Sequence, residues 1–168
     1  MCHIPYSNIF EKAENGLVVY KVAVERDLVP FRFKSNIDLI PTGDILSPIS
    51  PYIFEKRNDK EYYSPFAEAE IKIGTLMVDN NYFIYDADSD DEISYGYFHF
   101  FETIEDARRF LNWHFRQCNF NADSRPCILV GTIPEGEYYN RGIFPLNGDE
   151  FKSIIAKAVI YSGEIYYE

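Results

Sequence analysis

The stretch Tyr95-Gly-Tyr-Phe-His-Phe-Phe-Glu-Thr-Ile-Glu-Asp-Ala-Arg-Arg-Phe-Leu111 joins a strand pattern directly to a helix pattern. The aromatic residues up to Phe101 favour an extended strand, because such side chains pack well on a pleated sheet. Thr103 then offers its hydroxyl to the free N–H groups of a helical turn, and Glu105 and Asp106 in that turn complement the helix dipole. The sequence therefore predicts a strand ending near Phe101 and a helix over about 103–118.

The predicted helix is apolar on one side. Residues at three- and four-residue spacing form this face, namely Ile104, Ala107, Leu111, Phe115 and Cys118. Such a stripe is typical of a helix that covers a hydrophobic layer. We therefore expect the helix to lie on an aromatic-rich sheet.

Strand patterns occur on both sides of this segment. Leu17–Glu25 is apolar on both faces and predicts an inner strand, and Cys127–Ile133 predicts a second buried strand. Residues 67–73 and 76–85 also follow a strand pattern, with Gly74 as a bulge or turn and Asp79-Asn80-Asn81 as a hairpin tip. Residues 154–161 and 164–167 flank Ser162-Gly163, a pair typical of a tight hairpin.

Other segments predict turns, loops or a short helix. Pro5–Asn15 is interpreted as a short helix with Ser7 as its cap and Gly16 as its stop. Five prolines from Pro30 to Pro65 predict ordered loops with short strands. Three glycines are interpreted as turn residues: Gly136, Gly142 and Gly148. The whole chain, residues 1–168, is thus predicted to form one α+β domain with a mainly antiparallel sheet and one principal helix.

Composition narrows the classes of partner. The 168 residues carry 16 Lys and Arg against 27 Asp and Glu, a net charge of −11, which opposes direct binding to nucleic acid or anionic lipid and favours a protein partner with a basic surface. Paired tyrosines could stack on bases, but the sequence shows no basic groove to go with them. The three cysteines form no metal or disulfide motif, so we interpret them as inert thiols and expect a cytoplasmic protein without a membrane span.

The acidic stretch Asp86–Glu92 is the first candidate site. Three aspartates at alternate positions resemble a calcium loop, but that loop needs glycine at its sixth position and glutamate at its twelfth, where this chain has Asp91 and Tyr97. No metal site is therefore predicted. Three interpretations remain: a solvated charge run, an adventitious weak cation site, or a partner-binding patch made by Asp86, Asp88, Asp90, Asp91 and Glu92.

His99 is the second candidate. It alternates with Phe98 and Phe100 along the predicted strand, so it either hydrogen-bonds at the wall of the core or contacts a ligand beside Tyr97. No nucleophile elbow, catalytic triad spacing or glycine-rich phosphate loop is visible in the sequence. Spacing alone therefore fixes no reaction.

Two segments carry a resemblance to known proteins, Gly96-Tyr-Phe-His-Phe-Phe-Glu-Thr-Ile-Glu-Asp-Ala107 and Ile133-Pro-Glu-Gly-Glu-Tyr-Tyr139. They resemble a group of small, functionally uncharacterised bacterial and phage-borne proteins. More distantly, together with Val19-Tyr20, they are similar to ADP-ribosyltransferase-like domains. That second resemblance implies NAD as cofactor, with Tyr97 and His99 beside a nicotinamide pocket and Glu135 or Glu137 as the carboxylate.

Three functional hypotheses follow. The first is an acidic binding protein, of which a phage or mobile-element inhibitor of a host protein is one form. The second is an active or degenerate ADP-ribosyltransferase-like enzyme. The third is a homo-oligomer in which exposed strands pair edge to edge.

Overall fold

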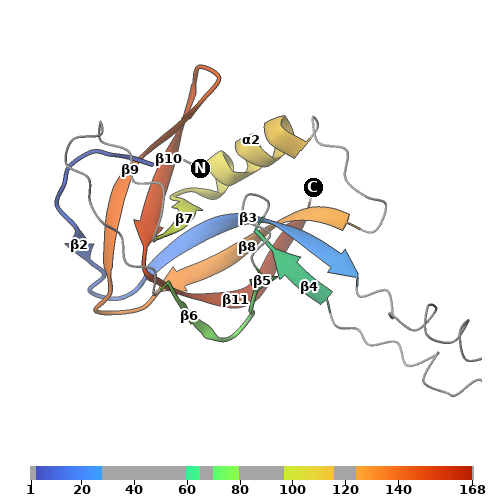
Figure 1. The fold of residues 1–168 in the computed structure, drawn as a ribbon, viewed down its shortest axis with the longest axis horizontal. Helices are drawn as coiled ribbons and strands as arrows, with labels where there is room; N and C mark the ends of the chain where they lie inside the picture. The colour runs from blue at the N-terminus through green and yellow to red at the C-terminus, as the bar shows by residue number, and fades with distance from the viewer. Residues whose placement is uncertain (1–2, 28–59, 65–69, 80–96, 116–123, 168) are drawn as a thin grey trace, which may run out of the picture.

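The computed structural model describes residues 3–27, 60–64, 70–79, 97–115 and 124–167. Within these residues eleven strands form one sheet, in which the strands pair antiparallel, and a helix packs on it (Figure 1). The α+β prediction is confirmed in this form. The elements are β1 (Ile4–Pro5), β2 (Glu11–Lys12), β3 (Leu17–Asp27), β4 (Lys60–Tyr63), β5 (Glu70–Ile71), β6 (Leu76–Val78), β7 (Phe98–Phe101), α2 (Ile104–Phe115), β8 (Ser124–Ile133), β9 (Tyr138–Leu146), β10 (Asp149–Ala156) and β11 (Ala158–Tyr167).

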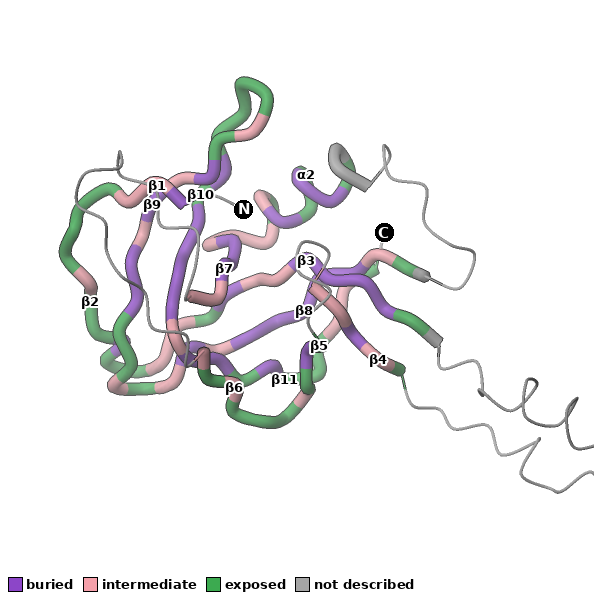
Figure 2. Tube along the Cα trace, in the orientation of Figure 1, coloured by how far each residue is buried: buried purple, intermediate pink, exposed green. Residues whose placement is uncertain are grey.

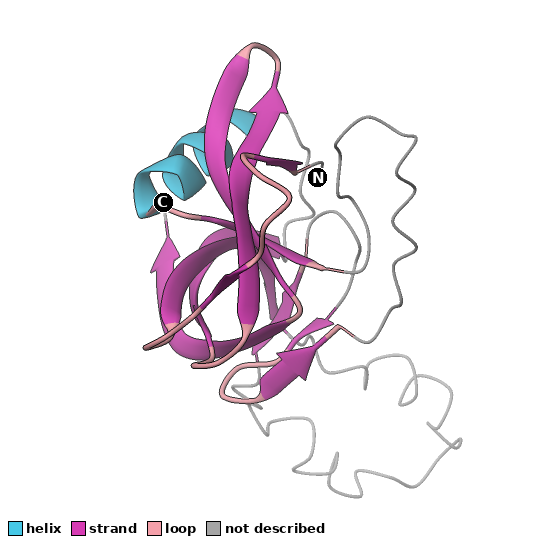
Figure 3. Ribbon diagram, turned by 90° about the vertical axis from the view of Figure 1, so that its left-hand side faces the viewer, coloured by secondary structure: helices cyan, strands magenta, loops and turns pink. Residues whose placement is uncertain are grey.

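The strand order is β1-β9-β10-β7-β3-β8-β11-β6, with β2 attached to β9 and β4 attached to both β3 and β5. The sheet is strongly curled, as the turned view of Figure 3 shows. A bridge between Ile73 and Tyr161 ties the chain beyond β5 to β11. The β4–β5 pair, which is attached to β3, is thus also linked to β11.

Strands β3 and β8 form the longest pair in the sheet. Ten register pairs run from Leu17↔Ile133 to Arg26↔Ser124. This confirms the prediction that Leu17–Glu25 is an inner strand. Because side chains alternate along a strand, each of these two strands supplies apolar groups to both faces of the sheet.

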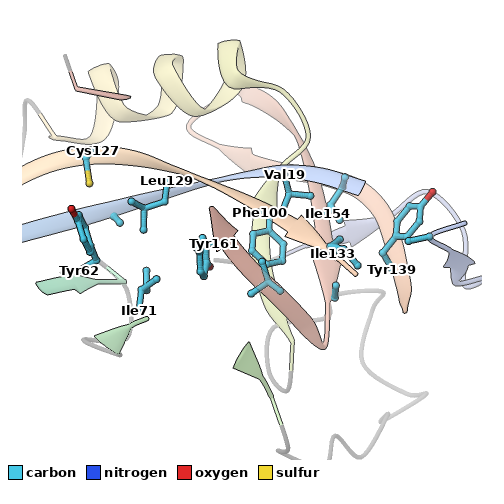
Figure 4. Close-up of a cluster of buried hydrophobic side chains, with 14 residues drawn as sticks. Val19, Tyr62, Ile71, Phe100, Cys127, Leu129, Ile133, Tyr139, Ile154 and Tyr161 are labelled. Carbon is cyan, nitrogen blue, oxygen red and sulfur yellow. The ribbon is translucent and has the colours of Figure 1, made fainter. Parts of the chain in front are cut away.

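The inner face of the curl holds the larger core (Figure 4). Val19, Ala23 and Leu129 point from β3 and β8 toward Tyr161 and Phe100, and all five are at most 1% exposed. Tyr62 and Ile71 close this core from β4 and β5. Glycine is needed at position 131, since a Cβ atom there would lie 2.9 Å from Val159 Cγ2.

Helix α2 covers the other face. Its capping residue was predicted correctly, because the Asp106 N–H donates to Thr103 Oγ1 at 3.1 Å. Ala107 and Leu111 are buried and Ile104 is half-buried, which confirms the one-sided helix for these residues. Cys118 and the side chain of Phe115 lie outside the described part of the structure.

Phe110 is the centre of the helix-side core. Its ring centroid lies 5.1 Å from that of Phe101, 5.7 Å from Phe144 and 5.8 Å from Phe151. The ring is fully buried. It therefore joins the helix to β7, β9 and β10 at once, and aromatic pairs at such distances add to the free energy of burial.

The helix predicted over Pro5–Asn15 is wrong. This segment forms β1 and β2, which pair with β9. The Tyr6 N–H donates to Arg141 O at 2.9 Å, and the side-chain amide of Asn140 donates to Ser7 O and Ile9 O. Residues of β9 thus form hydrogen bonds with the backbone of this segment. A weakly apolar helix would have had to supply these hydrogen bonds within itself, without packing to stabilise it.

The hairpin predicted at Ser162-Gly163 is also wrong. Strand β11 continues through both residues, and its register against β8 shifts between Tyr161 and Ile165. This register shift makes the Ser162-Gly163 pair a β-bulge. The hydroxyl of Ser162 donates to Val130 O at 3.3 Å and holds the strand against β8. A tight turn occurs instead at Asn147-Gly148, where both φ angles are positive, and it joins β9 to β10.

Gly142 was predicted to be a turn residue and lies inside β9 instead. A Cβ atom at this position would lie 2.0 Å from Ile4 O, so only glycine allows β1 to approach. Strand β6 ends at Val78, directly before the predicted hairpin tip, and β5 covers Glu70–Ile71 of the predicted 67–73. Residues 65–69 and 80–85 and most of the proline-containing stretch lie outside the described residues.

We expect Phe110→Ala to lower the free energy of unfolding by about 3–5 kcal/mol, because it leaves a cavity among three aromatic rings. Asn112→Ala, an exposed change on the same helix, should alter it by less than about 0.5 kcal/mol. Urea unfolding followed by circular dichroism measures both. Equal, small effects of the two substitutions would contradict the placement of α2.

Candidate functional site

Tyr97 and His99, predicted as candidates beside a ligand, lie in environments of packed rings. Tyr97 is partly buried, and burial raises the pKa of its hydroxyl. Its ring stacks on Phe10 with centroids 5.6 Å apart. His99 is 7% exposed, and its ring lies edge-on to that of His3 at 6.5 Å. His99 is therefore buried at the wall of the core, and its contact with a ligand stays a prediction.

Glu135 and Glu137 lie in the exposed turn between β8 and β9. Among the described residues, neither carboxylate forms a hydrogen bond or ion pair with Tyr97 or His99. Glu137 acts through its backbone, whose carbonyl accepts the Ala13 N–H at 2.9 Å. The implied NAD site stays a prediction that no contact between these four residues supports.

The acidic residues from Asp86 to Glu92 lie outside the described part of the chain. Where the structure does describe side chains, no group of three or more His, Cys, Asp or Glu residues could hold a metal ion. None of the described helical segments is both long enough and apolar enough to span a membrane.

A buried polar network holds the N-terminal segment. The Nδ1 atom of His3 lies 2.7 Å from Ser153 Oγ, and Nε2 lies 3.0 Å from Asn140 Oδ1. A serine, a histidine and an amide in contact resemble a nucleophile and its base. All three residues, however, are at most 1% exposed, so no substrate reaches the hydroxyl in this structure. The network acts as a clamp between β10, β9 and the chain start.

Burial lowers the pKa of His3, against a smaller opposite effect of its hydrogen bond with Asn140. The folded state thus favours the neutral ring, whereas the unfolded chain gains a proton below its ordinary pKa of 6.5. The contribution of His3 to stability is complete above that pH and is lost as the pH falls toward the lowered value.

We therefore expect the loss of unfolding free energy caused by His3→Gln to be larger at pH 7.5 than at pH 5.5. Urea titrations of both proteins at the two pH values measure this difference, and His99 is common to both. If His3→Gln costs the same free energy of unfolding at both pH values, His3 is not held in its neutral form.

A second polar cluster surrounds Glu25 at the end of β3. The carboxylate is 4% exposed and accepts hydrogen bonds from Lys60, at 2.8 Å, from Tyr167 and from Tyr62. Burial alone would raise the pKa of Glu25, but the Lys60 and Tyr167 hydrogen bonds outweigh it and lower the pKa. Burial and the hydrogen bond to Glu25 raise the pKa of Tyr167 to about 12. The carboxylate is fully partnered, so it anchors the end of β11 to β3 and β4.

Tyr167→Phe should reduce the free energy of unfolding by about 1–2 kcal/mol, because it removes a hydrogen bond to a charged group from a partly exposed phenol. Tyr138→Phe is the matched control, since Tyr138 is exposed and its hydroxyl forms no hydrogen bond with another described residue. Chemical unfolding at neutral pH compares the two. The same stability for both variants would rule out the anchor.

Cys127 is completely buried behind this cluster. Burial and the nearby charge of Glu25 raise the pKa of its thiol to about 12. The thiolate is the reactive form of cysteine, so we expect this group to be inert at neutral pH. Cys127 is thus a free, buried thiol, and its inertness stays a prediction, whereas Cys2 and Cys118 lie outside the described residues.

Lys21 is an inward-facing cation on β3 that the sequence did not single out as a site. Its Nζ donates to His99 O at 2.9 Å, at the place where β7 leaves β3 after the single pair Tyr20↔Phe101. Burial lowers the pKa of this amine to about 8. The contact replaces a backbone hydrogen bond that the diverging strand can no longer make, which is a structural role.

The clearest surface feature is an aliphatic patch, made by Val18, Leu76, Val78 and Ile160. Their exposed fractions are 51%, 52%, 48% and 38%. Three of these residues share one cross-strand row over β3, β8, β11 and β6, in the order Val18, Thr132, Ile160, Leu76. Figure 2 shows the exposed tube at β6.

The aliphatic patch belongs to the face that carries α2. Phe101, Tyr20 and Val130 form the next cross-strand row on that face, and Phe101 packs against the helix. In Figure 1, α2 lies above β3 and β8, whereas β6 lies at the far end of the sheet. The helix thus covers one part of this face and leaves the aliphatic patch open.

Sequence reasoning missed the aliphatic patch because strand patterns show alternation but not which face a helix covers. Val18 and Ile160 look like core residues in sequence. No protein-family model, curated protein or solved structure matches this chain.

Proposed function

We propose that this protein is a cytoplasmic binding module that acts by holding a protein partner with a basic surface. The observation that carries the proposal is the aliphatic patch. Single exposed apolar residues are common on soluble proteins, but neighbouring ones in one row are typical of interaction sites. Here four aliphatic side chains from three strands lie together on one face.

The negative charge of the chain supports a partner with a positively charged surface. A net charge of −11 attracts a basic surface over long range and raises the rate of encounter. Apolar contact then supplies the short-range part of the binding free energy. An inhibitor of a host protein, the form that the resemblance to phage-borne proteins suggests, is one such module.

The acidic residues Asp86, Asp88, Asp90, Asp91 and Glu92 extend this proposal. In the sequence Asp86 follows Asp79, the last described residue after β6, by seven positions. We propose that these carboxylates contribute to attraction of the same basic partner. Raising the salt concentration should therefore weaken binding.

The double variant Leu76→Lys/Ile160→Lys tests the proposal. It places two charges in the aliphatic patch, and we expect it to lose a specific partner by about tenfold or more in affinity, equivalent to about 1.4 kcal/mol. The control is Ile9→Lys/Tyr138→Lys, which adds the same charge at exposed apolar residues outside the patch. Affinity capture at low and high salt, with quantitative mass spectrometry, compares both with the wild type.

A protein retained by the wild type and the control, weakened by salt and lost from the patch variant supports the proposal. If both variants retain the same proteins, or if nothing is retained specifically at low salt, the proposal is wrong. Circular dichroism of each variant checks that the fold is kept.

A further inference from the structure

Among the strands that the structure describes, β6 is an unpaired edge of the sheet. It is the last strand in the order, and its residues Leu76, Met77 and Val78 carry no charge and include no proline. The opposite end differs, because β1 contains Pro5, which has no N–H to offer. Natural proteins usually protect a sheet edge with charged residues or proline, so an uncharged aliphatic edge is typical of a site where another strand binds.

The hydrogen-bonding direction of β6 follows from its pairing. The Asp79 N–H donates to Lys157 O at 2.8 Å, so the backbone groups of Asp79 point toward β11. Directions alternate along an antiparallel strand, so those of Met77, paired with Val159, point the same way. The N–H and C=O groups of Leu76 and Val78 therefore point away from β11.

These outward groups are available to a ligand. In the described part of the chain, no hydrogen bond engages the outward N–H or C=O of Leu76 or Val78. The same two residues carry half-exposed side chains of the aliphatic patch. One short edge thus offers backbone donors and acceptors together with apolar contact area.

We infer that β6 binds an extended segment of the basic partner as an added strand. This inference rests on the proposed function and names its mode of binding. Backbone hydrogen bonds to Leu76 and Val78 would supply the pairing, and apolar side chains of the guest would contact the aliphatic patch. Alternate positions of the guest face the same side, so a pattern of apolar and basic residues fits this edge.

The charge of the chain decides between a basic segment and a second copy as the occupant. Two copies each carry a net charge of −11 and repel one another. Strand β6 is three residues long, so an added strand gains few hydrogen bonds. Its affinity therefore depends on apolar contact and on electrostatic attraction. A basic guest gains from electrostatic attraction, whereas a second copy does not.

Val78→Pro and Val78→Thr separate strand addition from plain apolar contact. Proline removes the outward N–H but breaks no bond to β11, and the extended backbone before it is compatible with proline. Threonine keeps that N–H and the branched shape but is more polar. The probe is a fluorescent peptide, acetyl-Lys-Val-Lys-Val-Lys-Val-Lys-amide, with binding followed by anisotropy and by amide hydrogen exchange.

We expect Val78→Pro to weaken peptide binding by about tenfold, and Val78→Thr to weaken it by less than about threefold. In the wild-type complex the amides of Leu76 and Val78 should exchange more slowly than in the free protein. Failure of the peptide to bind, equal binding to Val78→Pro and wild type, or slowed exchange only elsewhere would overturn the inference.

Two further results separate this inference from the proposed function. If the captured partner is lost with the lysine substitutions but kept by Val78→Pro, strand addition is wrong and the binding module stands. If neither change affects capture, the proposed function itself is wrong. A free protein that sediments as a dimer, and as a monomer after Val78→Pro, would identify a second copy as the occupant and overturn the basic segment.

Discussion

The pairing of β3 with β8 is the constraint on which the rest of the structure depends. Over ten register pairs these strands send alternate side chains to opposite faces. Val19 and Leu129 thereby enter the core inside the curl, whereas Val22 and Ile128 enter the core beneath α2. A slip of one residue would exchange the two sets, so both cores fix the same register.

The same pairing explains why one surface stays open. Tyr20 and Val130 lie in the row next to Phe101 and the helix, and the row that begins at Val18 lies beyond it. Helix α2 is too far along the sheet to cover that row, which ends at β6. The aliphatic patch and the free edge are thus consequences of a helix that covers only part of a wide, curled sheet.

Local signals predicted the central elements well. Thr103 with the stripe through Ala107 and Leu111 identified the helix, and the valines of Leu17–Glu25 identified the inner strand. The predictions that were wrong depend on long-range contacts. The segment Pro5–Asn15, predicted as a helix, forms strands because it pairs with β9. Ser162-Gly163, predicted as a hairpin, is a bulge because β8 continues beside it. The clamp at His3 joins residues more than 130 positions apart, so no spacing in the sequence could reveal it.

Native-state hydrogen exchange tests this account most directly, because it reports which pair of strands opens last. The account predicts that the amides of β3 and β8 between Val19 and Val24 and between Cys127 and Gly131 exchange only through global unfolding. Amides of β9 and β10 should open at a lower free energy. If the β9–β10 amides outlast those of β3 and β8, the central pair is not the element on which the fold depends.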